Sequence, residues 1–138
     1  MMTDEEAARL IGLPTATFPS WTQGVLITDT HQDDNPIIYA NAGFSRLTGY
    51  GLEEILGRNC RFLQGEGSDP GTVARIRQAI AYRRGFQGEI LNYRRDGTSF
   101  LNQLTIGPAR STEEGRYFIG LQIDVTPVAR RPNNTGSS

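Results

Sequence analysis

Residues 88–107 read GEILNYRRDGTSFLNQLTIG and carry the clearest structural signal in the chain. Two runs rich in apolar residues flank Asp96-Gly97, a dipeptide typical of a tight β-hairpin turn. Period-two alternation places Asn102, Leu104 and Ile106 on one face of the second run. This segment therefore predicts an antiparallel hairpin with strands over 88–95 and 98–107.

Other segments extend this hairpin into a sheet with helices around it. Three further strands are predicted, over 24–29, 36–40 and 117–125. Helices are predicted after Asn41, over 52–56, and from Pro70 onward with Asp69 as the cap. The sum is an α+β fold, in which a five-stranded antiparallel sheet carries short helices on one face.

The two ends of the chain differ from its middle. We predict an N-terminal cap over 1–24, a folded core over 25–125 and a flexible tail over 126–138. The cap contains a short helix that begins at Thr3 or Asp4. Phe18 and Trp21 are interpreted as cover for the core, or as a contact between two copies of the chain.

Composition and charge exclude several classes of function. The chain has 14 Lys and Arg against 15 Asp and Glu, so its net charge of −1 favours neither nucleic acid nor an anionic membrane surface. No apolar run is long enough to span a bilayer, and the first ten residues are acidic rather than signal-like. One cysteine and one histidine form neither an internal disulfide nor an ordinary zinc site. We expect a cytoplasmic protein that binds no metal.

The single cysteine, Cys60, lies in the segment GRNCRFLQ over 57–64. Apolar Phe62 and Leu63 must turn inward, which places the thiol near the inner side of the same turn. Three polar side chains lie beside it: Asn59, Arg61 and Gln64. Taken alone, a free cysteine is most often buried filler. A cysteine hydrolase is disfavoured, because His31 is the one imidazole and no third orienting group is evident.

Three carboxamides, Asn92, Asn102 and Gln122, lie on different predicted strands among apolar residues. On the last strand, Gln122 shares a face with Phe118 and Gly120. If these faces point inward, each unsatisfied amide costs about 1–3 kcal/mol. A carboxamide both donates and accepts hydrogen bonds, which suits a heterocycle with carbonyls and ring nitrogens. Solvated, outward-facing amides are the alternative, but three together beside a glycine favour a ligand.

Five motifs occur in order along the chain: NPIIY at 35–39, LTGY at 47–50, GRNCRFLQ at 57–64, LNYRRDG at 91–97 and YFIGLQ at 117–122. In order and spacing they resemble the motifs of the LOV (light-oxygen-voltage) family, the flavin-binding blue-light sensors of the PAS superfamily, and in particular its short bacterial type. The likeness runs from about Val25 to Val125, which is nearly all of the predicted folded part.

The resemblance implies a PAS fold that encloses an FMN between helices and sheet. By position, Cys60 is the thiol that adds reversibly to flavin carbon C4a after blue light is absorbed. Asn92 and Asn102 would bind the pyrimidine edge, and Gln122 would face O4 and N5. The ribityl chain and phosphate would be met by Asn59, Arg61, Gln64 and Arg77. The ring would be lined by Leu26, Thr28, Ile37, Leu63, Leu104, Ile106, Phe118 and Gly120.

The resemblance also implies a sensor rather than an enzyme. Adduct formation protonates N5, and Gln122 would then rotate its amide and alter the hydrogen bonding of the last strand. The output would leave through this strand or through the N-terminal cap, and a homodimer through the cap or the sheet face is an option. The glycine-rich loop over 64–68 is expected to loosen the phosphate side. No amphipathic helix follows Val125, as expected for a short photoreceptor or for a piece of a longer sensor.

Three other interpretations are weighed against a light sensor. The first is a PAS-like module that senses a ligand or redox state without light chemistry, against which Cys60 within the full motif argues. The second is a dimerisation domain without a ligand, which leaves the strand amides unexplained. The third is a cysteine enzyme. The visible spectrum before and after blue light distinguishes these interpretations.

Overall fold

Five strands form one antiparallel sheet in the computed structural model, which describes residues 2–12, 23–109 and 115–126. The strands are β1 (Gly24–Asp29), β2 (Ile37–Ala40), β3 (Phe86–Tyr93), β4 (Ser99–Pro108) and β5 (Tyr117–Asp124). Their order across the sheet is β2-β1-β5-β4-β3, and every neighbouring pair is antiparallel. The first and last strands are therefore paired inside the sheet, with β2 and β3 at its edges.

The hairpin predicted around Asp96-Gly97 is present, with shifted ends. β3 begins at Phe86 rather than 88, because this residue pairs with Ile106 near the far end of β4. It ends at Tyr93 because the next residue closes the turn: the Arg94 N–H donates to the Thr98 carbonyl at 2.8 Å. Gly97 adopts φ +90°, a left-handed conformation that glycine takes without strain.

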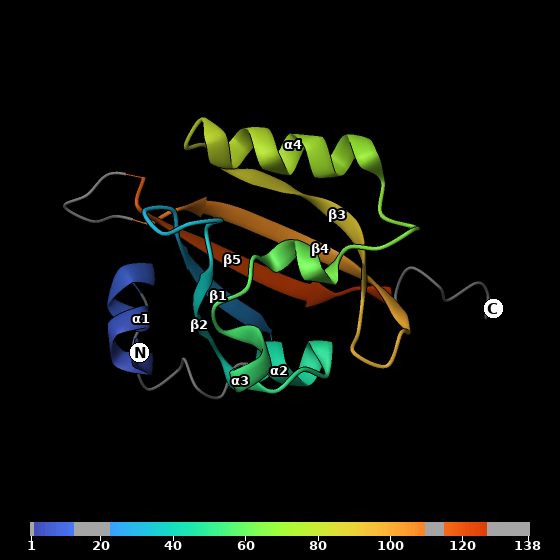
Figure 1. Ribbon diagram of the computed structural model, residues 1–138, viewed down its shortest axis with the longest axis horizontal. Coiled ribbons are helices and arrows are strands. Elements are labelled where there is room, and N and C mark those ends of the chain that lie inside the picture. The colour runs from blue at the N-terminus through green and yellow to red at the C-terminus, as the bar shows by residue number, and fades with distance from the viewer. Residues whose placement is uncertain (1, 13–22, 110–114, 127–138) are drawn as a thin grey trace.

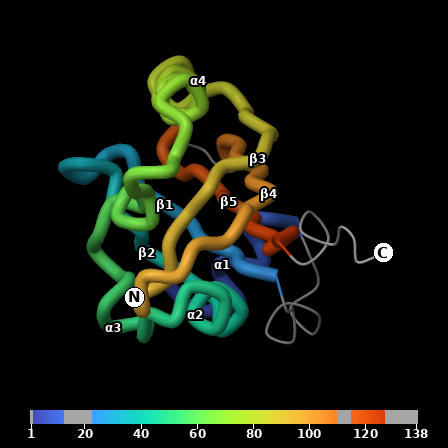
Figure 2. Tube along the Cα trace, turned by 90° about the vertical axis from the view of Figure 1, so that its right-hand side faces the viewer, coloured from blue at the N-terminus to red at the C-terminus, as the bar shows by residue number. Residues whose placement is uncertain are grey.

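In the described part of the chain, four helical segments cover one face of the sheet (Figure 1). They are α2 (Ala42–Thr48), α3 (Leu52–Ile55), the 3₁₀ helix η2 (Cys60–Leu63) and α4 (Pro70–Ala81). Helix α4 lies along β3, whereas α2 and α3 lie toward β1 and β2; Figures 1 and 2 place η2 between these two groups. The predicted caps are confirmed, since Asn41 accepts from the Phe44 N–H and Asp69 from the Thr72 N–H, each at 2.9 Å.

Helix α1 (Asp4–Ile11) lies on the opposite face of the sheet. The sequence predicts helices on one face only. The N-terminus of α1 carries a capping box in which Thr3 and Glu6 exchange hydrogen bonds. Buried Ala7 and Ala8 pack in one cluster with Val25, Ile27 and Tyr39. On β1, Val25 and Ile27 alternate with Leu26 and Thr28, so this strand contacts α1 on one side and the interior layer on the other.

The predicted α+β class and five-stranded antiparallel sheet are confirmed. The expectations for Phe18, Trp21 and residues 127–138 lie outside the described ranges, and the division at residues 24 and 125 stays a prediction. None of the helices in those ranges is long and apolar enough to cross a membrane. Nor do the described residues contain a group of three His, Cys, Asp or Glu side chains that could hold a metal ion.

Candidate ligand-binding site

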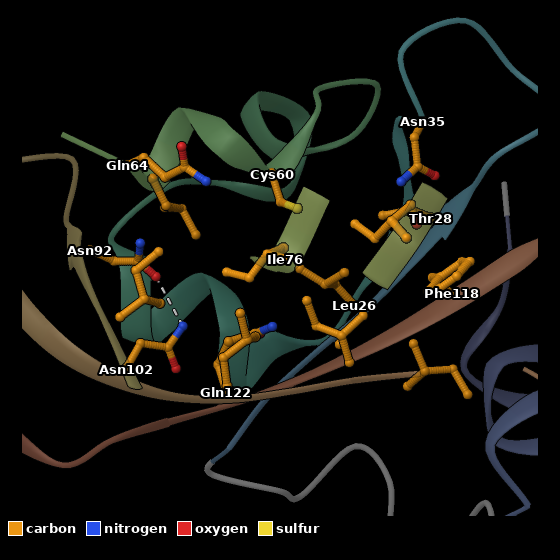
Figure 3. Close-up of a pocket in the computed structure, with 17 residues that line it drawn as sticks. Leu26, Thr28, Asn35, Cys60, Gln64, Ile76, Asn92, Asn102, Phe118 and Gln122 are labelled. Carbon is orange, nitrogen blue, oxygen red and sulfur yellow. Dashed lines mark hydrogen bonds between the residues drawn. The ribbon is translucent and has the colours of Figure 1, made fainter. Parts of the chain in front are cut away.

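A cavity lies between the inner face of the sheet and the helices that cover it (Figure 3). It contains about 580 Å³ of space between atoms, including its opening to solvent. The lining residues are Leu26, Thr28, Asn35, Cys60, Leu63, Gln64, Ile76, Ile80, Ile90, Asn92, Asn102, Leu104, Ile106, Phe118, Ile119, Gly120 and Gln122. They come from four strands, η2, α4 and the loops beside them, so the cavity forms only when these elements pack together.

The floor of the cavity follows from the period-two alternation of β4 and β5. Along β5, buried Phe118, Gly120 and Gln122 alternate with residues that are more exposed to solvent. Gly120 has no side chain to project into the cavity, and there is little room for one: a Cβ built there would lie 2.9 Å from Gln122 Nε2 and 3.1 Å from Leu26 Cδ1. A glycine at this position therefore leaves room for a flat group to lie against the sheet.

Unpaired polar atoms identify the kind of ligand that the cavity suits. In the described part of the chain, four buried side-chain atoms have no hydrogen-bond partner: Thr28 Oγ1, Asn35 Oδ1, Asn102 Oδ1 and Gln122 Oε1. All four belong to residues that line this cavity. Since buried polar groups in folded proteins are nearly always paired, their concentration around one space indicates a ligand with several polar atoms.

Two asparagines on the paired strands β3 and β4 form one polar unit. Asn102 Nδ2 donates to Asn92 Oδ1 at 2.9 Å, as the dashed line in Figure 3 marks. Asn92 Nδ2 makes a longer hydrogen bond of 3.3 Å to the Leu91 carbonyl. This arrangement leaves the Asn102 carbonyl oxygen free to accept a hydrogen bond from a ligand.

Cys60 lies across the cavity from Gln122, with its sulfur directed into the space (Figure 3). The turn that carries it begins at Asn59, whose side chain accepts a hydrogen bond from the Arg61 N–H at 2.9 Å. Burial raises the pKa of the Cys60 thiol, so the group keeps its proton at neutral pH. The protein therefore presents a protonated thiol to the ligand rather than a thiolate.

A more polar groove continues outward from the cavity, and we call it the outer groove. It shares Asn35, Cys60 and Gln64 with the cavity, and Arg61 and Arg77 also line it. The outer groove also includes Asn59, whose side-chain Nδ2 donates to the Asp34 carbonyl at 2.7 Å. Two guanidinium groups from different elements thus stand near the mouth of the cavity, an arrangement that suits an oxyanion.

One residue of the predicted set lines neither the cavity nor the outer groove. Ile37, expected beside the ring, is 1% exposed and packs in the neighbouring core cluster with Phe44, Ile55 and Leu63. Its backbone is held there by hydrogen bonds to Gly57 and Arg58, at 2.9 and 2.8 Å. The rest of the predicted set lines either the cavity or the outer groove.

Five lining residues were not in the predicted set: Asn35, Ile76, Ile80, Ile90 and Ile119. The helical periodicity places Ile76 and Ile80 on one face, and alternation places Ile90 beside Asn92, so their inward direction could have been inferred. Asn35 carries no such signal, because it lies in a polar loop. Its φ of +47° is visible only in the structure.

The glycine-rich loop over 64–68 is anchored to β3, contrary to the expectation of a loose segment. The Gly67 N–H donates to Tyr93 Oη at 2.8 Å, and Ser68 Oγ donates to the Leu91 carbonyl at 2.5 Å. A Cβ on Gly65 would clash with the Tyr93 ring. The glycines therefore allow close approach to the strand.

The comparisons with known proteins agree with this geometry. A family profile described as PAS domain matches residues 22–127. The chain is 53% identical over 103 residues to the blue-light photoreceptor of Listeria monocytogenes, covering 75% of this chain and 41% of that protein. It is 43% identical over 122 residues to phototropin-1A of Oryza sativa subsp. japonica, covering 87% of this chain and 13% of that protein. The chain thus spans well under half the length of these curated relatives.

A comparison with solved structures gives the same result, and it includes structures of a single domain. The LOV domain from the Erythrobacter litoralis EL346 blue-light activated histidine kinase is 46% identical, with a TM-score of 0.73. That match covers 75% of this chain and 96% of the other. The chain therefore belongs to the PAS domain family. Within that family it is a LOV domain.

Proposed function

We propose that this chain is a blue-light photoreceptor domain that binds FMN and forms a reversible bond between Cys60 and flavin carbon C4a on illumination. The observation that carries the proposal is the set of four unpaired, buried polar atoms around a cavity that also contains the thiol. A ligand that bound there would be flat, apolar over its faces and polar at its edges. The isoalloxazine ring of a flavin has these properties.

Two sets of residues would bind two parts of the flavin, its ring system and its ribityl phosphate chain. Leu26, Leu104 and Phe118, which line the cavity, would enclose the faces of the ring, and Asn92 and Asn102 would bind its pyrimidine edge. The ribityl chain and phosphate would lie in the outer groove, where Arg61 and Arg77 would pair with the phosphate. A bound flavin supplies the absorption of blue light and an electrophilic ring carbon. Cys60 supplies the sulfur and, because its thiol is protonated, the proton as well.

The visible spectrum of the purified protein tests this proposal. Yellow protein that bleaches under blue light and recovers in darkness supports it. Flavin that binds without bleaching points to a ligand-binding module without light chemistry. Protein that stays colourless after expression with ample flavin contradicts the flavin site altogether.

Replacement of Gln122 by leucine is expected to shift the spectrum of the bound flavin while leaving the photobleaching intact. The side chain lies in the floor opposite Cys60, and its carbonyl oxygen has no hydrogen-bond partner among the residues that the structure describes. Leucine removes this buried unpaired oxygen, so we expect the flavin-free protein to be as stable as the parent or more stable by about 1 kcal/mol. Absorption spectra and thermal unfolding measure the two effects.

Gln103→Leu is the matched control, because Gln103 lies on the adjacent strand β4 but is not among the residues that line the cavity. This variant should leave the flavin spectrum unchanged. A Gln122→Leu protein whose dark spectrum and light response match those of the parent would refute the role proposed for Gln122.

We further propose that the structural change caused by light is transmitted to other parts of the protein through the end of β5. Asp124 follows Gln122 by two residues and forms an ion pair of 2.6 Å with Arg94 of the β3–β4 turn. Beyond it, the Val125 N–H donates to the Leu101 carbonyl at 2.9 Å. A change in the hydrogen bonding of Gln122 would therefore reach a strand end that is held by a small number of identifiable contacts.

A further inference from the structure

The outer groove contains an acidic side chain beside the two arginines. Among the described residues that line it, the charged ones are Asp34, Arg61 and Arg77. Arg61 Nη2 pairs with Asp34 Oδ2, and both side chains are 58% exposed. Arg77 has no ion pair with any residue that the structure describes. One of the two guanidinium groups is thus already paired with a carboxylate of the protein.

The backbone of the β1–β2 loop holds this carboxylate at the groove. Asp34 and Asn35 adopt φ values of +66° and +47°, so two successive residues are left-handed. Asp and Asn tolerate this conformation better than most residues. The loop is also tied to the turn before Cys60, because Asn59 Nδ2 donates to the Asp34 carbonyl at 2.7 Å. Asp34 therefore stays beside Arg61 through main-chain as well as side-chain contacts.

We propose that Asp34 is a specificity-determining residue, which weakens the preference of this site for a phosphorylated flavin over riboflavin by neutralising Arg61. This inference rests on the flavin-binding function proposed above. A phosphate monoester carries roughly −1.5 to −2 charges at pH 7. Arg61 and Arg77 would attract it with two positive charges, of which Asp34 cancels one.

Asp34 is ionised under the conditions in which the flavin would bind. The hydrogen bond from Arg61 lowers the pKa of the Asp34 carboxyl below its usual value. A carboxylate and a phosphate on the same guanidinium repel each other, and because the groove is open to water this repulsion is screened and moderate. Riboflavin lacks the phosphate and is not subject to this repulsion.

Asp34→Asn tests the inference, since asparagine removes the charge and keeps the left-handed loop conformation. We expect this variant to bind FMN about three- to tenfold more tightly than the parent, with riboflavin affinity changed less than twofold. Both affinities are measured by titrating flavin-free protein and following the quenching of flavin fluorescence, at low and at high salt. The gain for FMN should shrink at high salt.

Asp33→Asn is the matched control, because it makes the same charge change one residue away and Asp33 does not line the outer groove. It should alter the ratio of the two affinities by less than twofold. In addition, Arg61→Gln should weaken FMN binding more in the Asp34→Asn protein than in the parent, because Arg61 is then no longer shared.

The outcomes separate this inference from other roles of Asp34. A loss of FMN affinity in Asp34→Asn, with riboflavin unaffected, would mean that the carboxylate orients Arg61 for the phosphate, which overturns the inference. An equal change for both flavins, or no change, also overturns it. If the parent bound neither flavin, the proposed function itself would fail, and this inference with it.

Discussion

Replacing Cys60 by alanine is expected to abolish the reversible bleaching completely while the protein still binds flavin. The sulfur is directed into the cavity, and the turn that carries it is capped by the Asn59 side chain. Alanine removes one atom, so the enclosure of the ring is retained. Absorption spectra recorded during a cycle of blue light and darkness measure the effect.

Two further variants make this experiment decisive. Cys60→Ser keeps the size of the side chain and should also fail to bleach, because a hydroxyl is a much weaker nucleophile than a thiol. Thr28→Val is the matched control: it changes another lining residue, removes an unpaired hydroxyl and leaves the sulfur in place. It should still bleach. Reversible bleaching of flavin-loaded Cys60→Ala would rule out the proposed bond.

The double variant Asn92→Leu, Asn102→Leu is expected to lose most of its affinity for flavin while the flavin-free fold is preserved. The two amides hydrogen-bond each other, so replacing both leaves neither partner unpaired, and such exchanges are nearly neutral for stability. The flavin edge would lose two or more hydrogen bonds in a buried place, about 2–4 kcal/mol in total, or roughly a 30- to 1000-fold loss of affinity. Fluorescence titration and thermal unfolding measure the two quantities.

Asn41 provides the opposite case among the buried asparagines. Its Oδ1 accepts from the Val25 and Phe44 N–H groups, both at 2.9 Å, and its Nδ2 donates to the Gln23 carbonyl at 3.1 Å. Asn41→Leu should therefore lower the free energy of unfolding by about 2–4 kcal/mol, through the loss of a helix cap and of strand contacts. Flavin affinity per folded molecule should change far less. If the double variant unfolds like Asn41→Leu instead, the asparagine pair is structural and its role in the site is wrong.

Much of this domain could be predicted from local patterns. The Asp96-Gly97 turn, the Asn41 and Asp69 caps and the alternation on β4 and β5 depend on interactions within a few residues. Such patterns also determine which side of a strand a residue faces. They therefore group Asn102 with Leu104 on one face of β4, and Gln122 with Gly120 on one face of β5. Only the packing of the helices decides that these faces are the inner ones.

Features that depend on distant partners could not be predicted in the same way. The side of the sheet that α1 covers depends on how its alanines pack against β1, and a short amphipathic helix suits either face. Ile37 alternates like a lining residue, yet its backbone bonds to Gly57 and Arg58 leave it in the adjacent cluster. Asn35 lies in a polar loop whose left-handed backbone is visible only in the folded chain.

The site therefore has two origins. Alternation along the strands groups the three amides with apolar residues of their own strands, and the inward turn of Phe62 and Leu63 places the thiol beside those two residues. The two guanidiniums at the mouth of the site follow only from the resemblance to the LOV family. Tertiary packing alone leaves Thr28, Asn35, Asn102 and Gln122 with unpaired oxygens around one cavity, since the partner of a buried polar atom comes from elsewhere in the chain. It also sets Asp34 against Arg61, a pair separated by 27 positions that no local pattern relates. Contacts between distant residues form only in the folded tertiary structure, whereas the face of a strand or helix on which a residue lies follows from the local sequence.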